Sequence, residues 1–204
     1  MPRPGDTGYD AAMPLDKPTL EGRYVRLEPV AEKHRELVRP AAQDPKIWSL
    51  TTSAFGALFD PYFDAALARS DGEREIAFAV LLLEPRRHVG MTRFLALEPA
   101  HRRLEIGSTW YNPTVWAGDV NPECKLLLMR HAFETLGYHR VELKTDARNQ
   151  RSRDAISRLG ATQEGVFRKH MVMADGHIRD SVWFSVIDIE WPDVRAGLER
   201  RLRY

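Results

Sequence analysis

The sequence predicts an α+β fold, α/β sandwich-like in its layers, with one mixed and mostly antiparallel sheet. Two observations support this class. Segments that alternate polar and apolar residues, as strands do, lie on both sides of two segments with helical periodicity. The 204 residues, 43% of them hydrophobic, can bury one core without disulfides or metal ions but are too few for two full domains. We therefore expect a single domain over residues 19–204 after an extended, Pro- and Gly-rich arm over residues 1–18.

The first part of the domain is predicted to hold one strand and two helical segments. Residues 23–27 alternate polar and apolar side chains, and Pro29 is expected to stop this strand because it cannot donate a ladder hydrogen bond. Helix-compatible residues then occupy 31–38 and about 57–69, with prolines that blur both boundaries.

Three strand-like runs fill the middle of the chain, at residues 75–83, 88–97 and 103–111. The connections between them are short, and contain Pro85 and Pro99. Short connections favour hairpins, so we expect an antiparallel meander.

An apolar stripe at intervals of three and four residues predicts a helix over residues 122–136. Asn121 is expected to be its N-cap, with Pro122 as the first helical residue and Glu123 near the positive end of the helix dipole. Gly137 fits the left-handed position after the last turn.

The last part of the chain returns to strands. The expected elements are a strand at 141–145, a capped helix at 149–159 ended by Gly160, strands at 163–173 and 180–187 joined by an Asp-Gly turn within 174–177, and a terminal helix that begins at Trp191.

The composition argues against several classes of partner. With 30 basic and 29 acidic residues, the chain lacks the positive field that binds nucleic acid, even though its last helix is rich in arginine. The longest apolar run, 76–83, is too short to cross a membrane. Cys124 is the sole cysteine, which excludes an internal disulfide and, without a secretory signature, favours a cytoplasmic location.

One segment has the arrangement of an anion site. The strand that contains Glu105 leads through an irregular loop into the helix at 122–136. Unpaired amides at the start of a helix can bind phosphate, and Lys125 on the first turn can add a positive charge. A simple connection between strand and helix is the alternative.

Several exact motifs in the second half of the chain carry a resemblance to a known family. They are Arg103-Leu-Glu-Ile-Gly107, Val120-Asn-Pro-Glu-Cys-Lys-Leu-Leu-Leu128, His131-Ala-Phe-Glu-Thr-Leu-Gly137, Arg140-Val-Glu-Leu-Lys-Thr-Asp146, Asn149-Gln-Arg-Ser152, Arg158-Leu-Gly-Ala161, Glu164-Gly165, Arg168-Lys-His170 and Glu190-Trp191. With these motifs the chain resembles the GCN5-related N-acetyltransferase (GNAT) superfamily, in its ribosomal-protein N-terminal acetyltransferase-like branch. The resemblance covers about residues 20–191 and says little about the acceptor.

The resemblance implies a sheet splayed at its centre, with helices on both faces. It also implies transfer of an acetyl group from the co-substrate acetyl-coenzyme A to a primary amine, either a protein N-terminus or a small molecule, by direct attack in a ternary complex. Pantetheine would lie between the strand of Glu105 and the strand at 140–145. The residues expected to contact the cofactor are Ser108, Thr109, Trp110, Tyr111, Trp116, Gly118, Asp119, Val120, Asn121, Lys125, Asn149 and Ser152.

The loop that would hold the pyrophosphate departs from the family pattern, which is Gln or Arg, two residues, Gly, one residue, then Gly or Ala. Trp116 stands at the first position and Asp119 where Gly is usual, while Gly118 lies one residue earlier. Either Asp119 points outward and the backbone still binds phosphate, or cofactor affinity is reduced. The second case includes a degenerate domain that binds coenzyme A or a protein partner without turnover.

Two residues are candidates for the catalytic steps. Glu105 is the candidate base that removes a proton from the amine, and the alternative is a solvated strand residue or an ion-pair partner of Arg103. Ser152 is the candidate acid for the departing thiolate, and the alternative is a local capping group. Asn149 is expected to cap its helix and to hydrogen-bond the cofactor, and Glu164 is the second-choice base.

Other notable residues have structural explanations. Cys124 lacks a pattern that pairs it with a catalytic His, so packing is expected. The histidines show no zinc spacing, no metal site is predicted, and surface or turn positions are expected for His34, His88, His101, His131, His139 and His177. Arg168 and His170 are expected to be surface or sheet residues. Core packing or the acceptor mouth is expected for Tyr24, Trp48, Phe55 and Phe59. A homodimer through the arm or the last strands is a further possibility.

Overall fold

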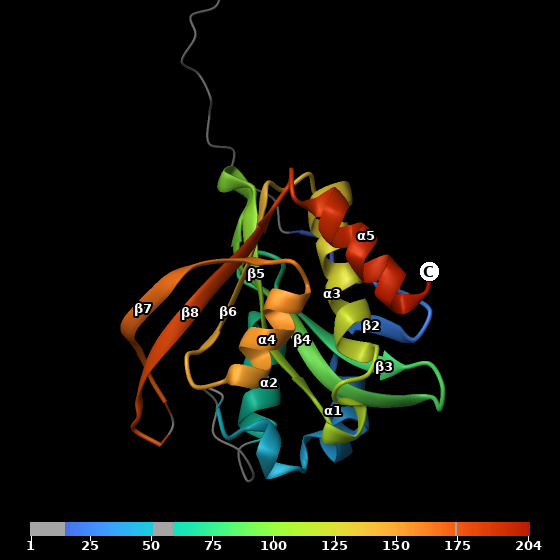
Figure 1. Ribbon diagram of the computed structural model, residues 1–204. Helices are drawn as coiled ribbons and strands as arrows, with labels where there is room; N and C mark the ends of the chain where they lie inside the picture. Colours follow the sequence, from blue (N-terminus) through green and yellow to red (C-terminus); the bar gives the residue numbers. More distant parts are fainter. Residues whose placement is uncertain (1–14, 51–58, 174) are drawn as a thin grey trace, which may run out of the picture.

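The computed structural model describes residues 15–50, 59–173 and 175–204, and its centre is an eight-stranded sheet (Figure 1). The strands lie in the order β1-β2-β3-β4-β5-β6-β8-β7. Neighbouring strands are antiparallel except β5 and β6, which are parallel. The predicted mixed, mostly antiparallel sheet and its middle meander, β3 to β5, are confirmed.

The strand boundaries differ from the predicted ones by at most a few residues. Pro29 is the last residue of β2 rather than a stop before its end, and the short β1 was not expected. The strands are β1 (Leu20–Glu21), β2 (Val25–Pro29), β3 (Ile76–Leu82), β4 (Arg87–Glu98), β5 (Arg103–Tyr111), β6 (Arg140–Asp146), β7 (Thr162–Val172) and β8 (Ile178–Ile187).

The helices are α1 (Arg35–Val38), α2 (Phe59–Arg69), α3 (Val120–Arg130), α4 (Gln150–Arg158) and α5 (Trp191–Leu202). The helix expected over 31–38 is split into a 3-10 turn, Glu32–His34, and the short α1. The long helix expected over 122–136 begins earlier and changes to a π-helical turn at His131–Thr135. The predicted turn at 174–177 lies partly outside the described residues, as does the start of the helix predicted near residue 57.

Two hydrophobic cores lie on opposite faces of the sheet. Along β3, Phe78 and Val80 belong to the core that includes residues of α3 and α5. Ala77 and Ala79 alternate with them and belong to the core that includes residues of α1 and α2. Helices therefore cover both faces, as expected, and Figure 1 shows α3 and α5 side by side.

The start of α3 corrects one prediction. Asn121 is not the N-cap, because the helix already begins at Val120, and the side chain of Asp119 in the N-cap position makes no capping bond. Glu123 in the first turn is fully buried and accepts hydrogen bonds from the backbone N–H groups of residues 23, 24 and 25 at 2.7–2.8 Å. The carboxylate therefore fixes the turn between β1 and β2 to α3.

The start of α4 agrees with the sequence prediction. Oδ1 of Asn149 accepts a hydrogen bond from the backbone N–H of Ser152 at 3.1 Å, so Asn149 is the N-cap. Gly160 follows the helix with φ +94°, a left-handed conformation that suits glycine. No helix in the described part of the chain has the length and apolar character needed to span a bilayer.

Candidate active site

The parallel strands β5 and β6 are paired at only one end. Their register pairs Arg103 with Arg140, Leu104 with Val141 and Glu105 with Glu142, and then the pairing stops. Residues 106–111 of β5 and 143–146 of β6 have no partner on the other strand. The expected splay is therefore present, and it frees backbone amides and carbonyls along the opening.

A bulge in β5 lies within the splayed part. The register with β4 passes from Gly107 opposite Arg93 to Trp110 opposite Met91, which leaves one extra residue on β5. Ser108 in this bulge is exposed and has φ +45°, a strained conformation for a residue with a side chain. The bulge turns this stretch of β5 away from regular pairing beside the opening.

Glu105 lies on the last paired rung, where the two strands begin to separate. Its side chain is buried, and Oε2 accepts a hydrogen bond from Nζ of Lys144 on β6 at 2.7 Å. Burial raises the pKa of the Glu105 carboxyl, and the positive charge of Lys144 opposes that rise. The alternative reading as an ion-pair partner of Arg103 is wrong, because Arg103 lies near Glu98 and Glu142 instead.

Charged residues near Glu105, two of them buried, were missed by the sequence analysis. Lys144 pairs with Glu105, Asp146 accepts two hydrogen bonds from the Arg148 guanidinium, and Arg179 is buried with an unpartnered Nε. Lys144 and Asp146 alternate along β6, so they lie on the same face of a central strand. Charged residues at alternating positions of a central strand are the signal that would have revealed this cluster.

The loop before α3 has a defined conformation. Nε1 of Trp116 donates a hydrogen bond to the backbone O of Tyr111 at 2.9 Å. Ala117 follows with φ +61°, in the left-handed region. Asp119 is exposed and its side chain caps no amide. This exposure fits the alternative in which Asp119 points outward, whereas the effect on cofactor affinity stays a prediction.

Lys125 does not lie where the sequence analysis expected it. Its side chain is only 5% exposed, and Nζ donates a hydrogen bond to Oγ1 of Thr109 at 3.1 Å. Burial lowers the pKa of Lys125 to about 8. The ammonium is thus held beneath β5 and is not available at the surface of the loop before α3.

The first turn of α4 lies against this loop. Arg151 stacks its guanidinium over the indole of Trp116, with Cζ 3.5 Å from the ring centroid. Ser152 is half-buried, and its hydroxyl makes no hydrogen bond to any other residue that the structure describes. The structure therefore brings the loop residues and the start of α4 together, while the backbone of Ser108 to Tyr111 lies along the opening.

Three residues expected to contact the cofactor have their side chains packed in the hydrophobic cores. Nε1 of Trp110 donates to the hydroxyl of Tyr62 at 2.9 Å, within the core of α1 and α2. Tyr111 and Val120 are buried in the opposite core. These residues can offer only backbone groups to a ligand.

The surroundings of Glu164 and Cys124 bear on whether either residue can take part in catalysis. Glu164 is paired with the guanidinium of Arg140 and accepts a hydrogen bond from Ser185 at 2.8 Å. Chiefly through Arg140, the pKa of Glu164 is lowered to about 2, which makes this carboxylate a weaker proton acceptor than Glu105. Cys124 is fully buried, which raises its pKa to about 12 and confirms the packing role.

One cluster in the described residues has the composition of a metal site: Glu28, His34 and His88. Nδ1 of His34 accepts a hydrogen bond from the backbone N–H of Ala31 at 3.0 Å, so the ring proton is on Nε2 and is donated to Oε2 of Glu28. A protonated nitrogen cannot ligate a metal, and these residues do not fit one. The expected surface position of His34 is also wrong, since its side chain is buried.

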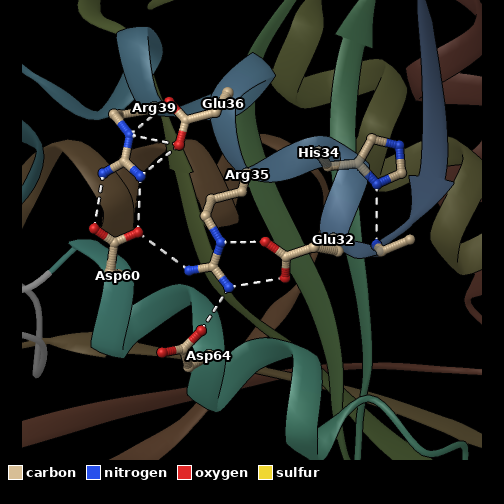
Figure 2. Close-up of polar contacts among 8 residues, drawn as sticks. Glu32, His34, Arg35, Glu36, Arg39, Asp60 and Asp64 are labelled. Atoms are coloured by element: carbon tan, nitrogen blue, oxygen red, sulfur yellow. Dashed lines mark hydrogen bonds and ion pairs between the residues drawn. The ribbon is translucent and has the colours of Figure 1, made fainter.

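Ion pairs connect α1 and the turn after it to α2, the elements expected near the acceptor mouth. Arg35 of α1 donates to Asp60 and Asp64 of α2, and Arg39 also donates to Asp60 (Figure 2). Of the residues proposed for the mouth, Trp48 and Phe59 belong to the adjacent core. Phe55 lies outside the described residues. Tyr24 is wrong for this role, because its hydroxyl donates to Leu202 in α5.

Comparison with known proteins places this geometry in a family. The chain is 29% identical over 102 residues to YdaF of Bacillus subtilis (strain 168), named as a candidate ribosomal N-acetyltransferase; the match spans 50% of this chain and 55% of YdaF. A GCN5-related N-acetyltransferase from Brucella melitensis is 32% identical, with 92% of this chain and 86% of that chain covered and a TM-score of 0.85. A candidate acetyltransferase from T. thermophilus is 38% identical, with 90% and 96% covered and a TM-score of 0.82.

A model of the acetyltransferase (GNAT) domain matches residues 25–162, which include the splayed strands, the bulge and the loop before α3. This match agrees with the resemblance that the motifs indicated. The chain belongs to the GNAT acetyltransferase family.

Proposed function

We propose that this chain, as one domain over residues 19–204, transfers the acetyl group of acetyl-coenzyme A to a primary amine. The observation that carries the proposal is the opening between β5 and β6 beyond Glu105, with its unpaired backbone groups. Pantetheine contains two amides, which need hydrogen-bond partners when they leave water. The free edge of β5 offers such partners in an extended, strand-like arrangement.

The phosphates of the cofactor fit the loop before α3. Residues 116–119 precede the first turn of a helix, whose amide N–H groups lack partners within the helix. The left-handed conformation of Ala117 is the kind of local strain that recurs at ligand loops. Acetyl-coenzyme A would supply the activated thioester.

Glu105 is the proposed base. In the reaction a C–N bond forms to the amine, the C–S bond of the thioester breaks, and the amine loses a proton. An aliphatic ammonium has a pKa of about 10, so a group near the acyl carbon must accept that proton. Burial raises the pKa of Glu105, which makes it a better acceptor than an exposed carboxylate.

The remaining roles belong to β5 and α4. Backbone amides of Ser108 to Tyr111 lie beside the opening and would stabilise negative charge on the thioester oxygen. Ser152 has a hydroxyl with no protein partner in the described residues and would return a proton to the thiolate. The amine attacks directly, since Cys124 is buried with a raised pKa and cannot form an acyl-enzyme.

The proposed acceptor is the N-terminal amine of a protein, with a small-molecule amine as the other case. The name of YdaF, a candidate ribosomal N-acetyltransferase, supports the first case. We also propose a cytoplasmic location, in keeping with a sole cysteine. A homodimer through β7 and β8 would cover the large hydrophobic side chains exposed there, Val166, Phe167, Val172 and Ile178.

Two measurements on the purified protein test the proposed activity. Titration calorimetry with acetyl-coenzyme A should detect saturable binding to one site per chain. Release of free thiol should then depend on an amine chosen from peptides with free N-termini, polyamines, aminoglycosides and aminoacyl nucleotides. Binding without thiol release for any amine would favour a degenerate domain, and absence of binding would refute the proposal.

A Glu105→Gln variant tests the role of the base. It should keep the affinity for acetyl-coenzyme A, because the side chain is placed to contact the amine proton and not the cofactor phosphates. The rate of thiol release should fall by roughly 10²–10⁴-fold, the usual contribution of a general base. An unchanged rate would exclude Glu105 from this step.

A further inference from the structure

A stacked pair joins two elements at the edge of the proposed cofactor site. The guanidinium of Arg151, in the first turn of α4, lies over the indole of Trp116, with Cζ 3.5 Å from the ring centroid. Trp116 is itself held by the hydrogen bond from its Nε1 to the backbone O of Tyr111 at 2.9 Å. The cation is therefore supported on a fixed platform at the first position of the loop before α3.

The charge of Arg151 is not neutralised by the protein. Among residues 15–50, 59–173 and 175–204, no carboxylate pairs with its guanidinium and no carbonyl accepts a hydrogen bond from it. The nearest arginines before and after it in the sequence differ in this respect, since Arg148 is paired with Asp146 and Arg153 donates to the backbone O of Ala147. The N–H donors of Arg151 are thus free for a ligand, and stacking leaves the edge of the guanidinium open.

The position of this cation compensates for a charge that the loop does not carry. Residues 112–119, between β5 and α3, contain no Lys or Arg, and Lys125 is buried with its Nζ on Thr109 of β5. We propose that Arg151, held on the face of Trp116, binds the pyrophosphate of coenzyme A and supplies from α4 the positive group that the loop lacks. The loop and α4 would then bind the nucleotide end together.

The chemistry of arginine suits this role. A guanidinium presents donors in a planar fork that matches two phosphate oxygens, and its flat faces stack on aromatic rings. Lysine has the charge without the plane, so it can replace arginine only in part. The indole keeps the guanidinium in place before the ligand arrives, which reduces the entropy lost on binding.

This inference rests on the proposed function, and its test separates the two. Calorimetry with coenzyme A and with 3′-dephospho-coenzyme A measures affinity without turnover. Arg151→Gln should weaken both ligands by about 10- to 100-fold, the value of a charge-assisted hydrogen-bond pair, and Arg151→Lys should recover part of the loss. Added salt should weaken binding to the wild type more than to Arg151→Gln.

Two further variants make the result specific. Arg158→Gln removes an arginine from the last turn of the same helix and should leave both affinities unchanged. Trp116→Leu should weaken coenzyme A, and its effect should largely disappear in the Arg151→Gln background, because the platform acts through the guanidinium. Melting temperatures of all variants check that the fold is retained.

Each contrary outcome has a distinct meaning. If the wild type binds neither ligand, the proposed function fails. If the wild type binds and Arg151→Gln binds equally well, the proposed function stands and the role of Arg151 is overturned. A loss confined to coenzyme A, with no loss for the 3′-dephospho form, would also overturn the inference, because it would assign Arg151 to the 3′-phosphate.

Discussion

Nζ of Lys144 lies 2.7 Å from Oε2 of Glu105, across the point where β5 and β6 separate. The pair combines two opposing influences on one carboxyl. Burial raises the pKa of Glu105, and Lys144 is the largest influence that lowers it. The base of the proposed reaction therefore has a pKa that depends on its partner as well as on its burial.

Removal of that partner should shift the pH dependence of the reaction. In Lys144→Met the pKa of Glu105 rises further, because the ammonium no longer stabilises the carboxylate. A base acts when deprotonated, so the acid limb of kcat/KM should move to higher pH. Measurement of kcat/KM against pH checks this. Lys33→Met, at an exposed position, is the control and should leave the acid limb of kcat/KM at the wild-type pH. If the acid limb of Lys144→Met also stays at the wild-type pH, Glu105 is not the base.

Gly107 controls the position of the same carboxylate. A Cβ at Gly107 would come 2.6 Å from Oε1 of Glu105 and 2.8 Å from Cδ1 of Leu95, both closer than carbon atoms tolerate. Gly107→Ala should therefore displace the carboxylate and lower kcat by about 10-fold or more, as small misplacements of catalytic groups do. Steady-state kinetics measure the effect. Gly165→Ala, where no atom lies within 4 Å of the added Cβ, is the matched control and should behave as wild type.

The order of elements was predictable from the sequence, since alternation and helical periodicity are local properties. Residues 103–111 were assigned as a strand with the boundaries that the structure has, and Asn149 was identified as a cap. Both features depend on neighbours within a few positions. The separation of β5 and β6 was predicted from the family resemblance of the motifs, because periodicity alone carries no information about it.

The sequence predictions were wrong where a side chain contacts a segment that is distant in the sequence. Asn121 looked like an N-cap, but α3 is anchored through Glu123, about 100 residues away from the turn that it binds. Lys125 looked exposed near a helix start, and the packing of α3 against the sheet buried it instead. The pairing of Glu105 with Lys144 required the parallel register of β5 and β6, which no local pattern reports.

Glu123 is expected to be important for stability. Its buried carboxylate accepts hydrogen bonds from three successive backbone N–H groups and one from the hydroxyl of Tyr204. Glu123→Ala leaves the N–H groups of Tyr24 and Val25 without a partner, while that of Arg23 keeps the Tyr204 hydroxyl, so the change should cost about 3 kcal/mol. Urea unfolding measures the loss. Tyr204→Phe removes one donor to Glu123 and one acceptor of the Arg23 N–H, which keeps its bond to Glu123, so it should cost much less; equal costs would contradict this account.

His34 should make stability depend on pH in the acidic range. Burial lowers its pKa in the folded state below the ordinary value of 6.5. The unfolded chain then binds a proton that the folded chain does not, so stability is lost as the pH falls through about 6.5. His34→Asn keeps a side-chain oxygen for the N–H of Ala31 and cannot be protonated. Its urea midpoint should fall less between about pH 7 and pH 5 than that of the wild type; parallel slopes would contradict the assignment.

Lys125 should make the free energy of unfolding rise with pH in the alkaline range, the same direction as the effect of His34 in the acidic range. Burial lowers its pKa from the ordinary 10.5 to about 8, so between these values the unfolded chain holds a proton that the folded chain has released. Stability should therefore rise with pH across this window. Lys125→Met removes the cost of burying the charge and should be more stable at neutral pH by up to about 3 kcal/mol, less the lost hydrogen bond to Thr109.

Urea unfolding of wild type and Lys125→Met at several pH values between about 7 and 10 tests this expectation. The two stability curves should converge as the wild-type lysine loses its proton. Lys46→Met, at an exposed position, removes a lysine without changing buried charge and should follow the wild-type slope. A Lys125→Met protein that retains the wild-type slope, or that is less stable at every pH, would show that the ammonium is stabilised in place by its surroundings beneath β5.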